Sequence, residues 1–118
     1  MLPFTLPQNV DRYHALMPRL ENFLARLRRA DLLRPATPVE GELARSLVQE
    51  ARRVTSRDSF GKGLRALKGD ELASRQTLLD RLEEADTALA AFHALYYCED
   101  GDDFEDGPFW RYVPPEEY

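Results

Sequence analysis

The chain is poor in the residues from which most active sites are built. Its 118 residues include one cysteine, Cys98, and two histidines, His14 and His93. Nucleophilic catalysis requires a serine or cysteine beside a histidine and an orienting acid, and neither histidine lies in such a motif. Glycine-rich fingerprints for phosphate binding are also missing. The sequence therefore indicates a protein that is not an enzyme and that needs no cofactor.

Long apolar runs and paired cysteines are missing as well. A lone cysteine cannot form an internal disulfide, which is typical of proteins in a reducing compartment. Residues 1–9 lack the basic start and apolar run of a signal peptide. No stretch approaches the length that spans a bilayer. We therefore expect a cytoplasmic protein that does not contact membranes.

The usual metal-binding patterns are incomplete. His93 and Cys98 share the end of one predicted helix, but two such ligands are too few for a structural zinc site. The acidic run 100–107 resembles a calcium loop only superficially. In one register Val113 stands where a bidentate glutamate is needed, and in another Glu105 stands where glycine is needed. We expect a solvated acidic loop and no metal site, with weak divalent binding as the alternative.

Arginine accounts for most of the positive charge. Only Lys62 and Lys68 are lysines among the 16 basic residues. The planar guanidinium of arginine binds carboxylates and phosphates in a bidentate manner, so this surface favours firm ionic contacts. The arginine-rich composition also favours a bacterial or phage origin. With 43% hydrophobic and 31% charged residues, the chain can form the core of a single domain.

The net charge of −5 conceals an uneven distribution. The segment Glu99–Tyr118 has eight acidic residues and Arg111 as its only base, a net charge of −7. The segment Arg26–Lys68 has eleven basic and five acidic residues, a net charge of +6. Such asymmetry is typical of chains that interact with charged partners or with their own other half.

The first apolar pattern predicts a helix that begins at Asn9 and continues to about Ala30. Apolar residues recur at spacings of three and four, which places them on one helical face. These residues are Tyr13, Leu16, Leu20, Phe23, Leu27 and Ala30. Pro18 lacks an N–H and disfavours helical geometry at Met17. We therefore expect either a kink at Pro18 or a short helix followed by a longer one.

The middle of the chain predicts one well-defined helix and one marginal helix. Thr37, Pro38 and Glu40 form the pattern of a capping box with proline at the first helical position. The helix that they start should end near Val54. From Ser59 to Lys68 the apolar spacing is again helical, although two glycines weaken a helix there by about 1 kcal/mol each.

A long helix is predicted from Glu71 to Tyr97, after a stop and an N-cap at Gly69 and Asp70. At 1.5 Å per residue it would span roughly 40 Å, which is long for so small a domain. Part of its apolar face should therefore remain for a partner or for a second copy in a homodimer. The predicted fold is all-α: an antiparallel bundle of three or four helices, residues 1–98, with an extended acidic, aromatic C-terminal arm, residues 99–118.

Three basic groups make the middle of the chain a candidate nucleic-acid site. They are Arg26, Arg28 and Arg29; Arg52, Arg53 and Arg57; and Lys62, Arg65 and Lys68. If the helices pack as hairpins, the groups could merge into one patch that neutralises phosphates. Residues 47–68 have the outline of a helix-turn-helix, but the turn lacks glycine and the reading helix contains two.

The C-terminal arm combines acids with aromatic side chains, which a merely solubilising tail does not need. The candidate partner-binding residues are Asp102, Asp103, Phe104, Glu105, Asp106, Phe109, Trp110 and Tyr112. Aromatic anchors flanked by carboxylates suit a partner with a basic cleft and apolar pockets, such as a protein whose nucleic-acid site is mimicked. In the alternative, the arm covers the protein's own bundle.

Two functions follow from these patterns. The first is a small cytosolic protein-binding module, an inhibitor or adaptor encoded by a bacterium, phage or mobile element, acting through the arm on a basic protein partner. The alternative is a nucleic-acid-associated subunit that binds through the region Arg26–Lys68, with the acidic arm as its autoinhibitor.

Overall fold

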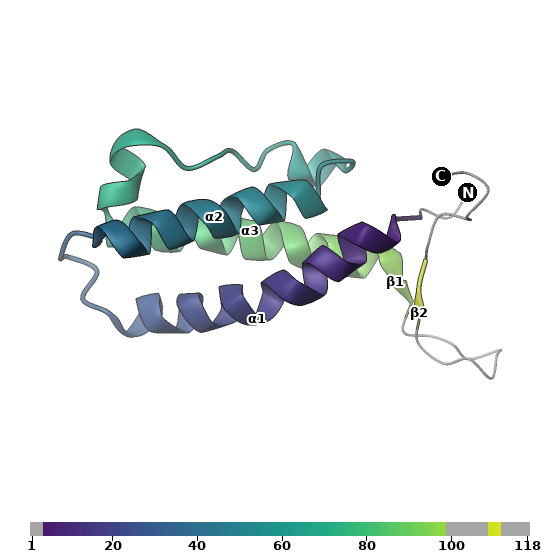
Figure 1. The fold of residues 1–118 in the computed structure, drawn as a ribbon, viewed down its shortest axis with the longest axis horizontal. Helices are drawn as coiled ribbons and strands as arrows, with labels where there is room; N and C mark the ends of the chain where they lie inside the picture. Colours follow the sequence, from purple (N-terminus) through teal and green to yellow (C-terminus); the bar gives the residue numbers. More distant parts are fainter. Residues whose placement is uncertain (1–3, 99–108, 112–118) are drawn as a thin grey trace.

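The computed structural model describes residues 4–98 and 109–111. Its main elements are three packed α-helices. The helices are α1 (Pro7–Arg29), α2 (Pro38–Val54) and α3 (Arg75–Tyr96), and they lie side by side along the long axis of the molecule (Figure 1). Their facing sides bury a continuous core that includes Leu20, Leu47 and Leu82. The predicted all-α bundle is therefore confirmed.

Helix α1 begins earlier than predicted and continues through Pro18. Its N-cap is Leu6, and Pro7 occupies the first turn, where a missing N–H costs nothing. The prediction of a start at Asn9 was wrong, since Asn9 is buried inside the helix. Figure 1 shows the path of α1 bending between its N-terminal part and the rest. Buried leucines on both sides of Pro18 hold the helix together across the missing hydrogen bond.

The start of α2 confirms the predicted capping box. The Glu40 amide donates to the Thr37 hydroxyl at 3.2 Å, and the Thr37 amide donates to the Glu40 carboxylate at 2.8 Å. Arg75, at the start of α3, donates to the same carboxylate at 3.0 Å. Burial alone would raise the pKa of Glu40, but these hydrogen bonds outweigh it and the pKa is lowered. The cap therefore also ties α2 to α3.

Helix α3 is shorter at its start than predicted. Residues Gly69–Ala73 form a 3-10 turn, η2, and the Ser74 hydroxyl caps α3 by accepting from the Thr77 amide at 3.3 Å. Gly69 has a φ of +62°, a left-handed conformation that favours glycine. A Cβ on Gly41 of α2 would lie 2.8 Å from the Leu72 carbonyl oxygen. This close packing of η2 against α2 explains why the helix does not begin at Glu71.

The predicted helix from Ser59 to Lys68 is also wrong. Only the 3-10 turn η1 (Ser59–Gly61) forms, and the chain then runs without regular structure to residue 68. A Cβ on Gly61 would lie 2.2 Å from the Thr55 carbonyl oxygen, so the backbones meet too closely for a helix to continue. We call residues 59–68 the connecting segment. It lies across the bundle beside α2 and α3 (Figure 1).

A buried arginine fixes the connecting segment to α3. Arg81 is 4% exposed and donates to the Arg65 carbonyl oxygen. It also contacts the carboxylates of Glu71 at 2.5 Å and Glu84 at 3.1 Å. Leu64 and Leu67 are buried beneath the same segment. The segment is therefore anchored by both a paired charge and apolar packing.

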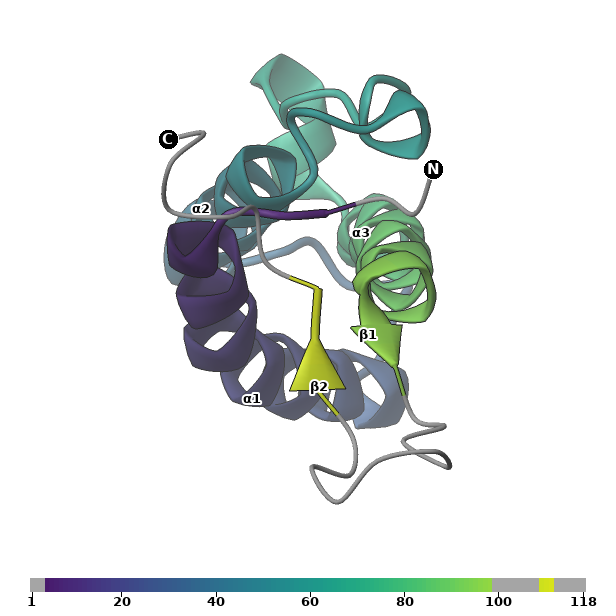
Figure 2. The ribbon, with the colours of Figure 1, turned by 90° about the vertical axis from the view of Figure 1, so that its right-hand side faces the viewer.

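Part of the C-terminal arm returns to the bundle. Strand β1 (Tyr97–Cys98) pairs antiparallel with β2 (Phe109–Trp110). The Arg111 amide donates to the Tyr96 carbonyl at 2.8 Å, and the Thr5 amide donates to the Arg111 carbonyl at 2.8 Å. Figure 2 looks onto this end and shows β2 between α1 and β1. Arg111 is thus hydrogen-bonded both to Thr5, just before α1, and to Tyr96, at the end of α3.

Candidate anion-binding trough

Two adjoining hollows lie between α2 and the connecting segment, each with a volume of about 390 Å³. They share Gln49 and Arg53, so we treat them as one feature, the basic trough. On α2 the lining extends from Glu42 to Arg53, about 17 Å at 1.5 Å per residue, and Ser56 lines it just beyond the end of the helix. The cationic side chains that line it are Arg12, Arg45, Arg52, Arg53 and Lys62.

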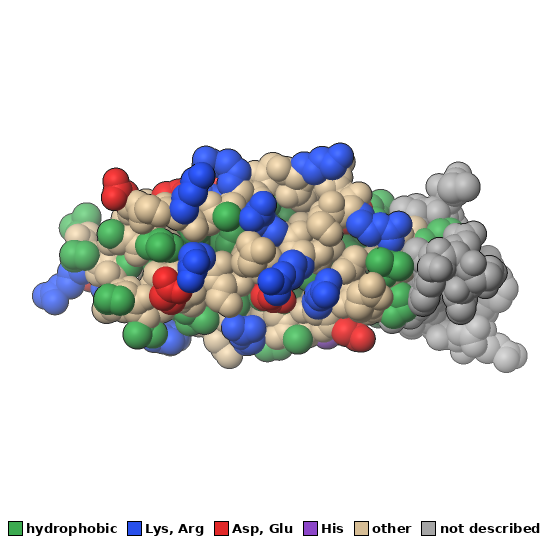
Figure 3. All heavy atoms as spheres, turned by 45° about the horizontal axis from the view of Figure 1, so that its top comes forward, with side chains coloured by type: hydrophobic (Ala, Val, Ile, Leu, Met, Phe, Trp, Pro, Cys, Tyr) green, Lys and Arg blue, Asp and Glu red, His purple; other side chains and the backbone are tan. Residues whose placement is uncertain are grey.

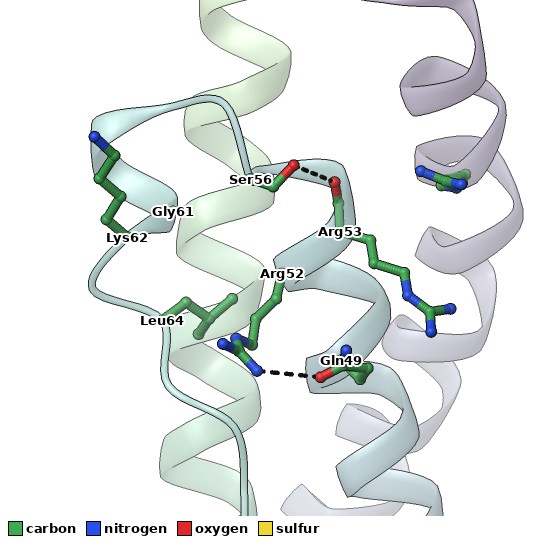
Figure 4. A pocket seen from close by; sticks show the side chains of 8 residues that line it. Gln49, Arg52, Arg53, Ser56, Gly61, Lys62 and Leu64 are labelled. Carbon is green, nitrogen blue, oxygen red and sulfur yellow. Dashed lines mark hydrogen bonds between the residues drawn. The ribbon is translucent and has the colours of Figure 1, made fainter.

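Adjacent arginines on α2 point to different sides of the trough. In Figure 4, Arg52 extends toward the connecting segment, where Leu64 lies, and Arg53 extends toward α1. The Arg52 guanidinium donates to the Gln49 side chain at 3.2 Å. Lys62 stands at the outer edge, on the far side from Arg53. Positive charge is therefore spread across the width of the trough.

Only some of these charges have acidic neighbours. Arg45 pairs with Glu42 at 2.6 Å and Arg53 with Glu50 at 2.5 Å. Both pairs are largely exposed, and such pairs are worth little in water, so a ligand can replace the carboxylates. Within residues 4–98 and 109–111, Arg12, Arg52 and Lys62 take part in no ion pair.

The hydrogen bonds of the two arginines go instead to neutral amides. Arg12 donates to the Asn9 side chain at 3.5 Å, as Arg52 does to Gln49. These bonds orient the guanidinium groups without neutralising them. The space-filling view shows this face of the molecule with many basic and few acidic side chains (Figure 3). The trough can therefore attract anions.

The three predicted basic groups do not form a single patch. Arg52, Arg53 and Lys62 line the trough, and Arg65 and Lys68 are exposed further along the connecting segment. Arg57 is exposed just after α2. The helix-turn-helix interpretation was wrong, because the supposed reading helix is the connecting segment.

The group at the end of α1 lies apart from the trough. Its three arginines are on the last turn of α1, and none of them lines either hollow of the trough. There Arg28 pairs with Glu83 at 3.9 Å, and the Arg29 side chain donates to the Ala25 carbonyl at 3.2 Å. The Arg26 guanidinium stands 5.9 Å from the centre of the Phe23 ring.

Two residues of the trough were missed by sequence reasoning. Arg45 could have been found, since Arg45, Gln49 and Arg52 recur at helical spacing on one side of α2. Arg12 could not, because only the packing of α1 on α2 brings it to residues that lie 40 positions later in the chain, as Arg52 does.

The C-terminal arm is the other candidate functional site. Its Trp110 belongs to an aromatic cluster. Its ring centre lies 5.4 Å from that of Tyr13, 5.8 Å from Phe92 and 5.1 Å from Tyr97. The Arg111 side chain adds a hydrogen bond of 2.8 Å to the Leu95 carbonyl. Trp110 is thus engaged within the chain itself, as the alternative for the arm expected.

The backbone of Phe109 pairs with Cys98 in the ladder. Most other predicted arm residues lie outside the described part of the chain: Asp102, Asp103, Phe104, Glu105, Asp106 and Tyr112. Their role as a partner-binding surface stays a prediction.

Other chemistries were searched for in the same residues. Among residues 4–98 and 109–111, no three His, Cys, Asp or Glu side chains come together in a way that could hold a metal ion. None of the helices in that part of the chain combines the length and the apolar character needed to traverse a bilayer.

Comparison with protein-family models, curated proteins and solved structures found no significant match.

Proposed function

We propose that the chain is a small non-enzymatic module whose basic trough binds the phosphate backbone of nucleic acid. One observation carries the proposal: Arg12, Arg52 and Lys62 come from α1, α2 and the connecting segment and meet in one open trough. In the described residues none of the three has an acidic partner. Three separate elements thus contribute uncompensated charge to the same place.

The character of the lining favours nucleic acid over an acidic protein segment. Protein partners gain most affinity from large aromatic or apolar anchors in fitted pockets. No aromatic side chain of the described residues lines the trough, whose apolar members are Leu64, Leu67, Gly61 and Ala66. Interfaces with nucleic acids are more polar and more positively charged. Arginine also binds phosphate in a bidentate manner.

The same lining favours a duplex over a single strand. Binding of single strands relies on aromatic platforms on which bases stack, and the described lining of the trough has none. A length of about 17 Å would follow about five phosphates of one strand, at 3.4 Å of axial rise each. Contacts to phosphates alone carry little sequence information. The module should therefore bind many duplex sequences alike.

Fluorescence anisotropy with a labelled 20-base-pair duplex of mixed sequence tests the proposal. Binding should weaken steeply with salt, with a log–log slope of roughly −3 to −5 if three to five phosphates are neutralised. The triple variant Arg12→Ala, Arg52→Ala, Lys62→Ala should lose at least tenfold in affinity and flatten the slope.

A matched control uses the basic group at the other end of the bundle. The triple variant Arg26→Ala, Arg28→Ala, Arg29→Ala removes the same net charge from outside the trough. It should retain most of the affinity. If both triple variants weaken binding equally, or if the wild type does not bind the duplex at low salt, the trough is not a nucleic-acid site.

A protein-binding module that acts through the arm is the second candidate. The pairing of Cys98 with Phe109 brings together the two residues that flank the acidic run 99–108 in the sequence. Fixing the ends of a loop lowers the entropy that is lost when it binds. This arrangement supports an inhibitor or adaptor whose acids meet a basic protein, and it equally supports an autoinhibitory role toward the basic trough.

A further inference from the structure

The outward side of α3 loses its charges in the second half of the helix. From Thr87 to Leu95 the side chains that point away from the core are Thr87, Ala90, Ala91, Ala94 and Leu95, all exposed or half-exposed. In a chain with 31% charged residues this is an unusual surface. A helix that is apolar on all sides is normally buried on all sides. This side of α3 therefore lacks a cover within the described chain.

Two hollows border this side of α3, with volumes of about 420 and 500 Å³. They share Phe60 and Ala91, and the residues between their ends are apolar or small. We call this feature the alanine groove. On α3 it extends from Glu84 to Leu95, about 16 Å along the helix. Alanine side chains leave room for another helix to approach closely.

The exposed charged side chains of the groove stand at its two ends. At the first end, Glu84 and Arg65 are both exposed at the rim, and Glu84 also pairs with the buried Arg81 at 3.1 Å. At the second end, Asp58 is buried and accepts a hydrogen bond from the Tyr96 hydroxyl, so its charge is satisfied within the chain. The exposed charge at that end is Arg57, whose positive charge opposes part of the rise that burial and Asp58 cause in the pKa of Tyr96. The rim thus carries both signs of charge at the first end and a basic side chain at the second, with no charged side chain of the lining between them.

We infer that the alanine groove is occupied by a second copy of this chain, with the two α3 helices antiparallel across a twofold axis near Ala91. A twofold contact places each surface against itself. The uncharged centre can meet itself without opposing like charges. The antiparallel arrangement also brings Glu84 of each copy toward Arg57 of the other. The basic trough lies on the other side of the connecting segment, so both troughs stay open in the dimer.

Light scattering and sedimentation of the full chain from 1 to 200 μM test the inference. The wild type should change from monomer to dimer within that range. Ala91→Glu and Ala91→Lys should each be monomeric throughout, because the axis places each new charge against its own copy. An equal mixture of the two variants should form a dimer again, since opposite charges then meet. Restoration on mixing cannot arise from misfolding.

The matched controls are Ala15→Glu and Ala15→Lys, at an exposed alanine of α1. Both should associate like the wild type. If an Ala91 variant does not fold by circular dichroism, the pair Ala94→Glu and Ala94→Lys replaces it at an exposed position of the same groove. A wild type that is monomeric up to 200 μM, or a mixture that stays monomeric, would overturn the inference.

The orientation of the helices has its own test. Arg57→Glu should raise the dimer dissociation constant about three- to tenfold, while Arg19→Glu, an exposed arginine of α1, should leave it unchanged. Equal effects of the two substitutions would exclude the antiparallel arrangement.

Discussion

The connecting segment divides the surface into two grooves of opposite character. On one side, against α2, Arg45, Arg52 and Arg53 make the basic trough. On the other side, against α3, Ala91 and Ala94 make the alanine groove. The two grooves share one wall, so their difference comes from the helix that faces it. A fixed backbone can thus present a surface for a hydrated polyanion beside one for dry packing, according to the outward residues of two helices.

The largest effect is expected from breaking the core that supports both grooves. Leu82→Asp or Leu89→Asp places a charge at a fully buried position. Each should cost more than about 4 kcal/mol and abolish the cooperative melting transition, together with duplex binding and dimerisation. Circular dichroism and calorimetry measure this loss. Leu33→Asp, at a position that is 96% exposed, should melt like the wild type.

Replacing Trp110 should distinguish the role of the arm from the roles of the two grooves. Trp110 packs on Tyr13 and Phe92, so Trp110→Ala should destabilise the isolated chain by about 2 kcal/mol, or roughly 5–10 °C in Tm. Combining it with Phe109→Ala should not reduce duplex binding at temperatures where the bundle is folded. An unchanged Tm would instead indicate that Trp110 does not stabilise the bundle and is available to bind a partner. Because Trp110 is the only tryptophan, its fluorescence reports on this cluster alone.

A smaller effect is expected at the end of the alanine groove. Tyr96→Phe leaves the buried Asp58 carboxylate without its hydroxyl donor and should cost about 1–3 kcal/mol. Tyr96→Phe should also weaken dimerisation more than it weakens duplex binding. Thermal melts and the two binding assays measure these changes. Thr77→Val, at a half-exposed hydroxyl on the first turn of α3, is the control for loss of a hydroxyl.

The same pair gives the protein a defined response to alkali. Burial, and then the hydrogen bond to Asp58, raises the pKa of Tyr96 from 10.0 to about 12. A group whose pKa is raised on folding stabilises the fold fully below its unfolded pKa, and this contribution is lost as pH rises toward 12. The free energy of unfolding should therefore fall more steeply between pH 10 and 12 in the wild type than in Tyr96→Phe. Parallel curves would contradict this.

The smallest effect is expected from the acidic arm. Converting Asp102, Asp103, Glu105 and Asp106 to their amides removes four negative charges without large changes in shape. If the arm limits binding to the basic trough, duplex affinity should rise by up to roughly tenfold at low salt and hardly change at high salt. If the arm instead binds a basic protein, duplex affinity should stay constant while association with that partner slows.

Local signals in the sequence predicted the fold well where the determinants are local. The Thr37–Glu40 capping box involves residues three positions apart, and both the start and the end of α2 were predicted correctly. The connecting segment was predicted wrongly because its path depends on distant partners. The close approach of Gly61 to Thr55 and the hydrogen bond from Arg81 to Arg65 are absent from any local pattern.

The candidate trough shows the same limit. Arg52, Arg53 and Lys62 were recognised as basic groups, but their convergence with Arg12 depends on how α1 packs against α2. The alanine groove was foreseen only as an apolar face left over on a long helix. Its position on α3 depends on which side of the helix is buried in the core.

The connecting segment, which Arg81 fixes to α3, is a wall of both grooves. Leu64 lines the basic trough on one side of the segment and the alanine groove on the other. If the filling of one groove shifts this shared wall, the free energy of filling the other groove changes with it. By thermodynamic linkage, whatever factor a bound duplex applies to self-association, self-association must apply to duplex affinity. The proposed duplex binding and self-association should therefore be measured together.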